Sequence, residues 1–353
     1  MQIPTIIKNC SLDIGNMNKV LSIIIPTYNM EDYLRQCLDS LIIADDLMQQ
    51  LEVLVINDGS KDQSSAIAHE YSRKHPSTIF VIDKENGNYG SCINRGLKEA
   101  TGKFIKILDA DDSFDSAALA EFINQLRDTN ADLVITNFSV VDSEGRTQQE
   151  VKYLLGESIF DISAYKEKAL EMHAITYRKN ILDSMEYRQS EGISYTDTEW
   201  AILPMTVVND VKFFNLRLYK YLCGRSGQTV EKDTLAKRSH QLIHIMNGIL
   251  TKLSSQDIKP NSQTYFDIVI PQKLNYVYSI VLLKGNEWQR RELKKTDLFL
   301  KANFSEYYNF LDAVKYSFIP VRFIHLWRNN RLIYGLFIRI VLILRKSLLP
   351  KEV

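Results

Sequence analysis

Residues 103–112 read KFIKILDADD, an apolar run that ends on three carboxylates. Acidic side chains gathered at the end of a strand repel one another unless a cation binds between them. We predict that Asp109 and Asp111 share one face of an extended segment, because alternate residues of a strand point to the same side. Oxygen ligands arranged in this way suit Mg²⁺ or Mn²⁺. The alternative is a strand-end turn in which Asp112 or Ser113 caps the next helix.

Four further apolar runs accompany this one, and helical periods lie between them. The runs are residues 21–25, 52–56, 79–82 and 133–136. Strands that alternate with helices of this length predict an α/β fold, with a mostly parallel sheet flanked by helices. Ligands of such sheets bind outside the carboxyl ends of the strands.

Composition excludes several classes of protein. The 353 residues include 43 basic and 43 acidic side chains, so no overall positive field favours nucleic acid. The four cysteines form no CxxC pattern, which predicts reduced thiols in a cytoplasmic protein and no zinc site. The first 18 residues lack the pattern of a signal peptide, and no apolar run reaches the roughly 18 residues of a membrane span.

The periodicity changes along the chain and predicts three parts. Residues 1–19 form a lead-in, residues 20–228 an α/β domain, and residues 229–353 a mostly helical region. Within the second part we expect two later strands, over 211–214 and 216–222. Within the third, residues 235–282 predict two long amphipathic helices.

Polar loops follow the predicted strands at one edge of the sheet. They are Pro-Thr-Tyr-Asn at 26–29, Asn-Asp-Gly-Ser at 57–60, Lys-Glu-Asn-Gly at 84–87, and the acids at 109–112. Each loop alone is also explained as a simple turn or helix cap, and Gly87 and Gly90 as relief of a tight backbone. Four such loops on one edge favour a binding site.

The series IIIPTYN, VINDGS, KENGNYGSCINRG and FIKILDADD resembles the nucleotide-sugar half of glycosyltransferase family 2 enzymes with the GT-A fold. The resemblance covers residues 21–115 closely. It implies that Asp109 and Asp111 coordinate a divalent metal, Mn²⁺ or Mg²⁺. It also implies a set of donor-binding residues, namely Pro26, Thr27, Tyr28, Asn29, Asp58, Lys84, Asn86, Gly90, Asp109, Arg225 and Gln228.

One departure from the family pattern concerns the diphosphate. Many relatives carry Ala-Arg-Asn before the fourth strand, whereas this chain has Cys92-Ile93-Asn94. A basic contact is therefore missing there, and we expect Lys84 or a later arginine to supply it.

A second acidic cluster, Tyr-Thr-Asp-Thr-Glu-Trp at 195–200, resembles the catalytic motif of the family. The matching general base is Asp197, with Thr196 where the family commonly has Glu. A base on the far side of the anomeric carbon is needed to take the proton of the acceptor hydroxyl. The alternative is that Thr196 or Asp197 only caps a helix over 199–205.

The stretch Gly-Arg-Ser-Gly-Gln at 224–228 is similar to a Gly-Arg-x-x-Gln stretch in relatives that build bacterial surface polysaccharides. It implies that Arg225 and Gln228 close over donor or acceptor phosphates, to which the planar fork of arginine is suited. The alternative is a loop arginine that pairs with a surface acid.

Residues 320–353 carry seven basic side chains and one acid, interleaved with apolar residues. Because Arg339 interrupts the apolar run, we predict a helix that lies in a membrane interface and does not span it. Basic residues would add attraction to anionic lipid. The alternative is a helix packed on its own domain or on a partner subunit.

Together these features predict an inverting, metal-dependent glycosyltransferase at the cytoplasmic face of a bacterial membrane. The resemblance favours a UDP-sugar donor and a lipid-linked or cell-wall glycan acceptor, and it makes no prediction about oligomeric state. One alternative is a catalytically inactive scaffold or sensor that binds nucleotide sugars. A nucleotidyltransferase is disfavoured, because residues 25–29 lack a Gly-rich loop with a basic residue.

Overall fold

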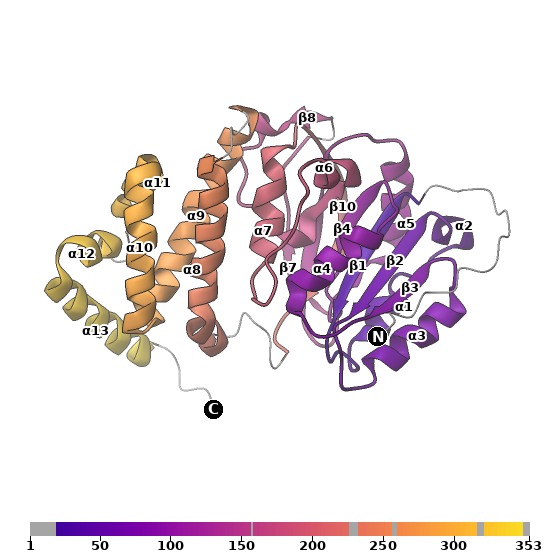
Figure 1. The fold of residues 1–353 in the computed structure, drawn as a ribbon, viewed down its shortest axis with the longest axis horizontal. Coiled ribbons are helices and arrows are strands. Elements are labelled where there is room, and N and C mark those ends of the chain that lie inside the picture. Colours follow the sequence, from indigo (N-terminus) through magenta and orange to yellow (C-terminus); the bar gives the residue numbers. More distant parts are fainter. Residues whose placement is uncertain (1–18, 157, 226–231, 256–259, 316–320, 349–353) are drawn as a thin grey trace, which may run out of the picture.

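The structure is a computed structural model that describes residues 19–156, 158–225, 232–255, 260–315 and 321–348. Within these ranges the α/β part is built on one ten-stranded sheet (Figure 1). Its strands are β1 (Leu21–Thr27), β2 (Leu51–Asn57), β3 (Ile79–Asp83), β4 (Phe104–Ile107), β5 (Ser113–Phe114), β6 (Leu133–Val141), β7 (Thr147–Val151), β8 (Phe160–Asp161), β9 (Ile175–Arg178) and β10 (Asp210–Leu222).

The sheet runs in the order β3-β2-β1-β4-β9-β6-β10-β5. Strands β3, β2, β1 and β4 are mutually parallel, and β10 is parallel to β6. Strand β9 is antiparallel to both of its neighbours, β4 and β6. The mostly parallel sheet is confirmed, and β1 and β2 are buried along their whole length, as apolar strands covered on both faces must be.

All five apolar runs predicted as early strands lie in β1, β2, β3, β4 and β6. The prediction of two later strands is wrong in one respect, because residues 211–214 and 216–222 belong to the single strand β10. The register of β10 against β6 shifts between Phe214 and Arg217 and again before Tyr219. These shifts coincide with the break between the two predicted strands.

Seven α-helices accompany the strands in the described part of the α/β region. They are α1 (Leu34–Asp39), α2 (Asp45–Met48), α3 (Ser64–Lys74), α4 (Asn88–Glu99), α5 (Ser116–Arg127), α6 (Lys179–Ser184) and α7 (Asp197–Ile202). Helix α5 is capped by Asp115, whose side chain accepts from the Ala118 amide (3.1 Å). The alternative that Asp112 or Ser113 caps this helix is therefore wrong.

The C-terminal region is helical, as predicted. It comprises α8 (Lys232–Ser255), α9 (Pro260–Lys284), α10 (Glu287–Asn303), α11 (Ser305–Ala313), α12 (Phe323–Asn329) and α13 (Arg331–Leu348). Figure 1 shows α8 and α9 beside the α/β region and α12 and α13 at the far end. The hydroxyl of Ser262 donates to the Met205 carbonyl (2.7 Å) and that of Tyr265 to the Ala201 carbonyl (2.9 Å), and both bonds are buried. These bonds fix α9 against the segment that follows Asp197.

The tail divides into an inner and an outer face. On the inner face Phe323, Ile324, Trp327, Tyr334, Phe337 and Val341 are buried. Arg328 is also buried and pairs with Asp297 and Asp312, so the tail packs on its own helices, which was the alternative to a membrane role. The outer face of α13 nevertheless exposes large apolar side chains, Leu332, Ile333, Leu336 and Ile340. Among the described helices, none is both long and apolar enough to cross a membrane.

Candidate active site

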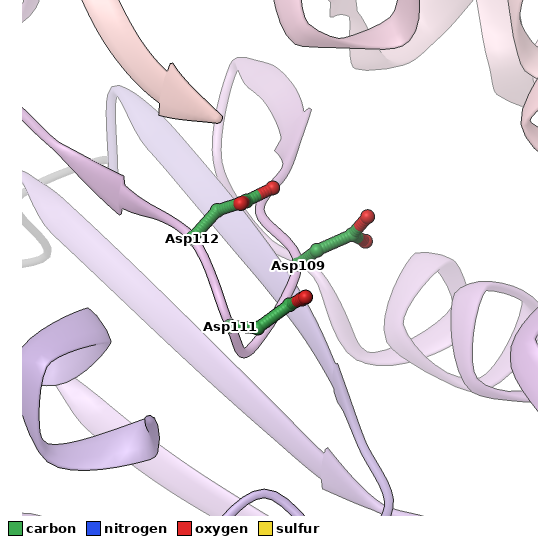
Figure 2. Close-up of side chains that lie close together, drawn as sticks. All are labelled: Asp109, Asp111 and Asp112. Carbon is green, nitrogen blue, oxygen red and sulfur yellow. The ribbon is translucent and has the colours of Figure 1, made fainter. Parts of the chain in front are cut away.

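The three carboxylates lie in a tight turn between β4 and β5. Figure 2 shows that their side chains extend from the same side of this turn. The amide of Asp112 donates to the carbonyl of Asp109 (3.0 Å), so the extended segment predicted here is wrong. One oxygen from each of Asp109, Asp111 and Asp112 lies within 4.8 Å of the others. The turn therefore brings the predicted ligands together by a different geometry from the one expected.

Asp112 has a structural role within this cluster. It is buried, its Oδ2 accepts from the Tyr219 hydroxyl (2.6 Å), and its Oδ1 accepts from the Leu222 amide (2.7 Å). Both oxygens thus hold the end of β10 against the turn. Asp109 and Asp111 remain as the residues best placed to reach a ligand.

The electrostatics of Asp109 favour a bound cation. Desolvation, followed by repulsion from Asp111, raises the pKa of the Asp109 carboxyl, although the Tyr89 hydroxyl donates to its Oδ1 (2.8 Å). A divalent ion would remove this repulsion, and hard carboxylate oxygens are what Mg²⁺ and Mn²⁺ prefer. The donor set therefore fits the predicted metal.

Arg225 supplies a cation to the turn in this structure. Its Nε lies 2.5 Å from Asp111 Oδ2, and its guanidinium lies over the Tyr33 ring, 5.3 Å from the ring centre. Pairing with an acid was the alternative to a phosphate contact. The acid is one of the two candidate metal ligands and not a surface residue, so Arg225 lies beside the predicted metal site. Gln228 lies outside the described residues.

Asp58 organises the loop after β3. It is buried and receives hydrogen bonds from the amides of Gly87 and Asn88 (both 2.9 Å), and it pairs with Lys84. Lys84 also donates to the hydroxyl of Ser91 (2.8 Å). The expected diphosphate contact of Lys84 would have to compete with this internal pairing.

The loop after β1 offers an aromatic face. Thr27 is buried at the strand end, but the Tyr28 side chain is 45% exposed. Asn29 accepts from the Lys61 amide (2.8 Å) and so ties this loop to the one after β2. Pro26 lies within the sheet, in register with Ile56.

Backbone strain gathers in the loops of this site. Asn29, Asn88 and Tyr195 have positive φ angles of 53°, 68° and 69°. Asparagine adopts such angles readily, whereas a bulky aromatic residue rarely does, so the strain lies mainly at Tyr195, two residues before Asp197.

The loop before Asp197 packs against the start of α4. Glu199 accepts from both the amide (2.7 Å) and the hydroxyl (2.8 Å) of Ser190. The Ser190 carbonyl in turn leaves no room beside Gly90, since a Cβ there would lie 1.9 Å from it. Asn86 is similarly occupied, donating to the Asp58 carbonyl (3.0 Å). Gly90 thus allows the close approach of the Ser190 carbonyl, and the side-chain nitrogen of Asn86 holds the loop after β3.

Asp197 is the first residue of α7. It is exposed to solvent, but enough protein atoms lie around its carboxyl group to remove part of the surrounding water. That desolvation raises the pKa of its carboxyl, and the nearby Lys273 of α9 opposes the shift. Its charge also reaches Asp109, whose pKa it helps to raise. Thr196 makes no side-chain capping bond to the helix, so the capping alternative is not supported for Thr196.

Several residues of the site escaped the sequence analysis. Tyr89 lies inside the KENGNYGSCINRG stretch, so a signal for it existed. Tyr219 of β10 and both Lys273 and Tyr276 of α9 come from distant parts of the chain. No local pattern links them to the acidic turns.

Comparisons with known proteins identify the family of the chain. Residues 22–184 match the model of a protein family described as glycosyl transferase family 2. The chain is 34% identical over 276 residues to the uncharacterized glycosyltransferase RP339 of Rickettsia prowazekii, covering 74% of this chain and 83% of that protein. It is 33% identical over 253 residues to GgaB, a minor teichoic acid biosynthesis protein of Bacillus subtilis, covering 69% of this chain.

The chain spans only 20% to 37% of the length of GgaB and of two further curated bacterial relatives. Among solved structures it is similar to residues 1–349 of Staphylococcus aureus TarS in complex with UDP-GlcNAc. The TM-score is 0.65 at 20% identity, covering 88% of this chain and 87% of that one. This likeness confirms the predicted GT-A-type fold.

Proposed function

The chain belongs to glycosyl transferase family 2, and on that premise we propose that it moves a sugar from a UDP-sugar to a hydroxyl of a cell-surface glycan, with inversion and with the help of a divalent metal. One observation carries the proposal. The Asp197 carboxylate approaches the acidic turn from another element, closely enough for its charge to be felt at Asp109. This proximity supports the assignment of a base at Asp197 and a metal site at the turn to one reaction.

Asp109 and Asp111 would hold the metal, which when bound acts as a Lewis acid toward the departing diphosphate. Arg225 adds positive charge on the same side, and its fork geometry suits phosphate oxygens. Tyr28 offers an exposed ring on which a nucleobase can stack, while Asp58 holds the neighbouring loop in shape. The favoured uracil rests on the TarS structure with UDP-GlcNAc.

Asp197 would act as the general base. An acceptor hydroxyl within hydrogen-bond distance of its carboxylate gives up a proton as the oxygen attacks the anomeric carbon. The nucleoside diphosphate leaves from the opposite face, so the configuration inverts. Lys273 and Tyr276 of α9 lie near enough to interact electrostatically with this carboxylate, which supports an acceptor side next to the helical region.

The acceptor class follows from the relatives. GgaB is named for minor teichoic acid biosynthesis, and TarS is a poly(ribitol-phosphate) β-N-acetylglucosaminyltransferase. A lipid-linked or wall-polymer glycan at the inner face of the cell membrane is the corresponding acceptor for this chain. The outer face of α13, with Leu332, Leu336 and Ile340 beside Arg331 and Arg339, is suited to lie on anionic lipid.

Donor hydrolysis tests the proposal. A panel of nucleotide sugars is incubated with the protein in Mn²⁺, and release of nucleoside diphosphate is measured with and without chelator. We expect one UDP-sugar to be hydrolysed in a metal-dependent way, and Asp111→Asn to lose both hydrolysis and metal-dependent donor binding. Asp183→Asn, on an exposed carboxylate of α6, is the matched control.

Two outcomes would contradict the proposal. Donor binding unaffected by chelator and by Asp111→Asn would remove the metal role. Tight donor binding with neither hydrolysis nor transfer would favour the alternative of a binding scaffold.

A further inference from the structure

A second cavity lies beyond the nucleotide site, where α8, α10 and the loop before Asp197 meet. Its volume is about 300 Å³, and its lining includes Ile193, His240, Gln241, Asn247, Trp288 and Glu292. None of these residues belongs to the donor site described above.

Trp288 gives the cavity its chemistry. Its side chain is 54% exposed, whereas Trp200 is fully buried and Trp327 nearly so. The indole lies against the His240 ring, 5.5 Å between centres. A flat apolar face bordered by amide and carboxylate side chains matches a pyranose ring, which has an apolar C–H face and a polar hydroxyl edge.

The charge of the lining selects among acceptor units. It contains one carboxylate, Glu292, and two imidazoles, His240 and His244, and among the described lining residues there is no Lys or Arg. A phosphate-bearing polyol would meet no lysine or arginine among these lining residues. The lining therefore favours a neutral sugar over a polyol phosphate.

The cavity is joined to the catalytic loop. Ile193 forms part of its wall and precedes Asp197 by four residues, which limits the separation of their Cα atoms to about 14 Å. The amide of Ser194 donates to Gln241 Oε1 (2.9 Å), and Arg238 donates to the Ser194 hydroxyl (3.2 Å). Both bonds hold this loop on α8, so a ligand in the cavity lies at a fixed position relative to the base.

We propose that this cavity is an acceptor subsite that stacks a neutral sugar unit of the acceptor glycan on Trp288, while a neighbouring unit presents its hydroxyl to Asp197. The inference rests on the proposed glycosyltransferase function. It adds the class of the bound unit and the residues that bind it.

Binding of defined glycans tests the subsite. Cellotetraose, maltotetraose and chitotetraose are titrated into the full chain, beside a ribitol-phosphate oligomer as the charged probe, with saturation-transfer NMR as the readout. We expect at least one neutral tetrasaccharide to bind. Trp288→Ala should weaken it about tenfold or more, the scale of losing a central aromatic contact. Asn247→Leu should also weaken it, whereas Phe310→Ala, at an aromatic that is 48% exposed on α11, should not.

Donor hydrolysis and donor binding, measured on the same variants, separate this inference from the proposed function. Both should survive Trp288→Ala, because the cavity lies outside the donor site. No binding of any neutral tetrasaccharide, equal binding by Trp288→Ala and wild type, or preference for the charged oligomer would overturn the subsite. If the wild-type protein does not hydrolyse any donor, that result would instead count against the proposed function.

Discussion

Replacing Arg328 by Met should destabilise the helical region, whereas the same change at Arg339 should not. The two arginines stand in neighbouring helices of one basic segment. Arg328 and its partner Asp297 have side chains only 2% and 1% exposed, and the Arg328 guanidinium also stacks 3.6 Å from the centre of the Tyr308 ring. Arg339 lies on the exposed face of α13.

The expected loss of unfolding free energy depends on the contacts that Asp297 keeps after the substitution. Breaking a buried ion pair costs about 3–5 kcal/mol, because one charge stays buried without compensation. Asp297 would retain Lys294 (3.1 Å) and the Tyr278 hydroxyl (3.0 Å), so we expect a loss near the lower end, about 3 kcal/mol of unfolding free energy. For Arg339→Met the change in unfolding free energy should stay within about 0.5 kcal/mol.

Urea unfolding followed by circular dichroism measures the first effect, and co-sedimentation with phosphatidylglycerol vesicles measures a second. Each basic residue at an anionic surface contributes about 1 kcal/mol, so Arg339→Met should weaken vesicle binding about fivefold. Equal stability of the two variants would refute the buried pair. Equal vesicle binding of wild type and Arg339→Met would refute the membrane role of the outer face.

Three further substitutions or conditions test the site. Asp197→Asn should keep donor affinity and lower turnover about 10²-fold or more, the scale of a lost general base; activity within a few-fold of wild type would place the base elsewhere. Desolvation raises the pKa of Asp197. As the pH falls, this carboxylate is therefore protonated at a higher pH than an ordinary aspartate, whose pKa is about 3.9. The acid limb of the kcat profile should therefore lie above that value, and a limb at or below it would contradict the assignment. Arg225→Met should tighten Mn²⁺ binding several-fold in the absence of donor, measured by electron paramagnetic resonance, because Asp111 no longer has to release a resident cation.

The features of this fold that depend on neighbouring residues could be predicted from the sequence. Apolar runs marked the early strands, and polar loops after them marked the ligand edge, because both signals come from neighbouring residues. The insertion of β9 antiparallel between β4 and β6 was not readable. It depends on pairings between segments that lie far apart in the chain.

The same limit explains the errors at the site. The acidic segment is a turn, and both oxygens of Asp112 accept hydrogen bonds from residues of β10 that lie more than one hundred positions later. The arginines of the tail look equivalent in the sequence. Only the acids of α10 and α11 that meet Arg328, and do not meet Arg339, tell them apart in the described structure.

Helix α9 links two parts of the molecule that the proposals concern, the loop of Asp197 and helix α13. The hydroxyl of Tyr334 on α13 donates to the Leu282 carbonyl of α9 (2.6 Å), and Lys273 of the same helix lies near Asp197. Nine residues of helix, about 14 Å, separate these two contacts. If α13 rests on a bilayer, α9 would fix the distance between the bilayer and the Asp197 carboxylate. Acceptors would then be chosen by how far their hydroxyl stands from the lipid as well as by their chemistry.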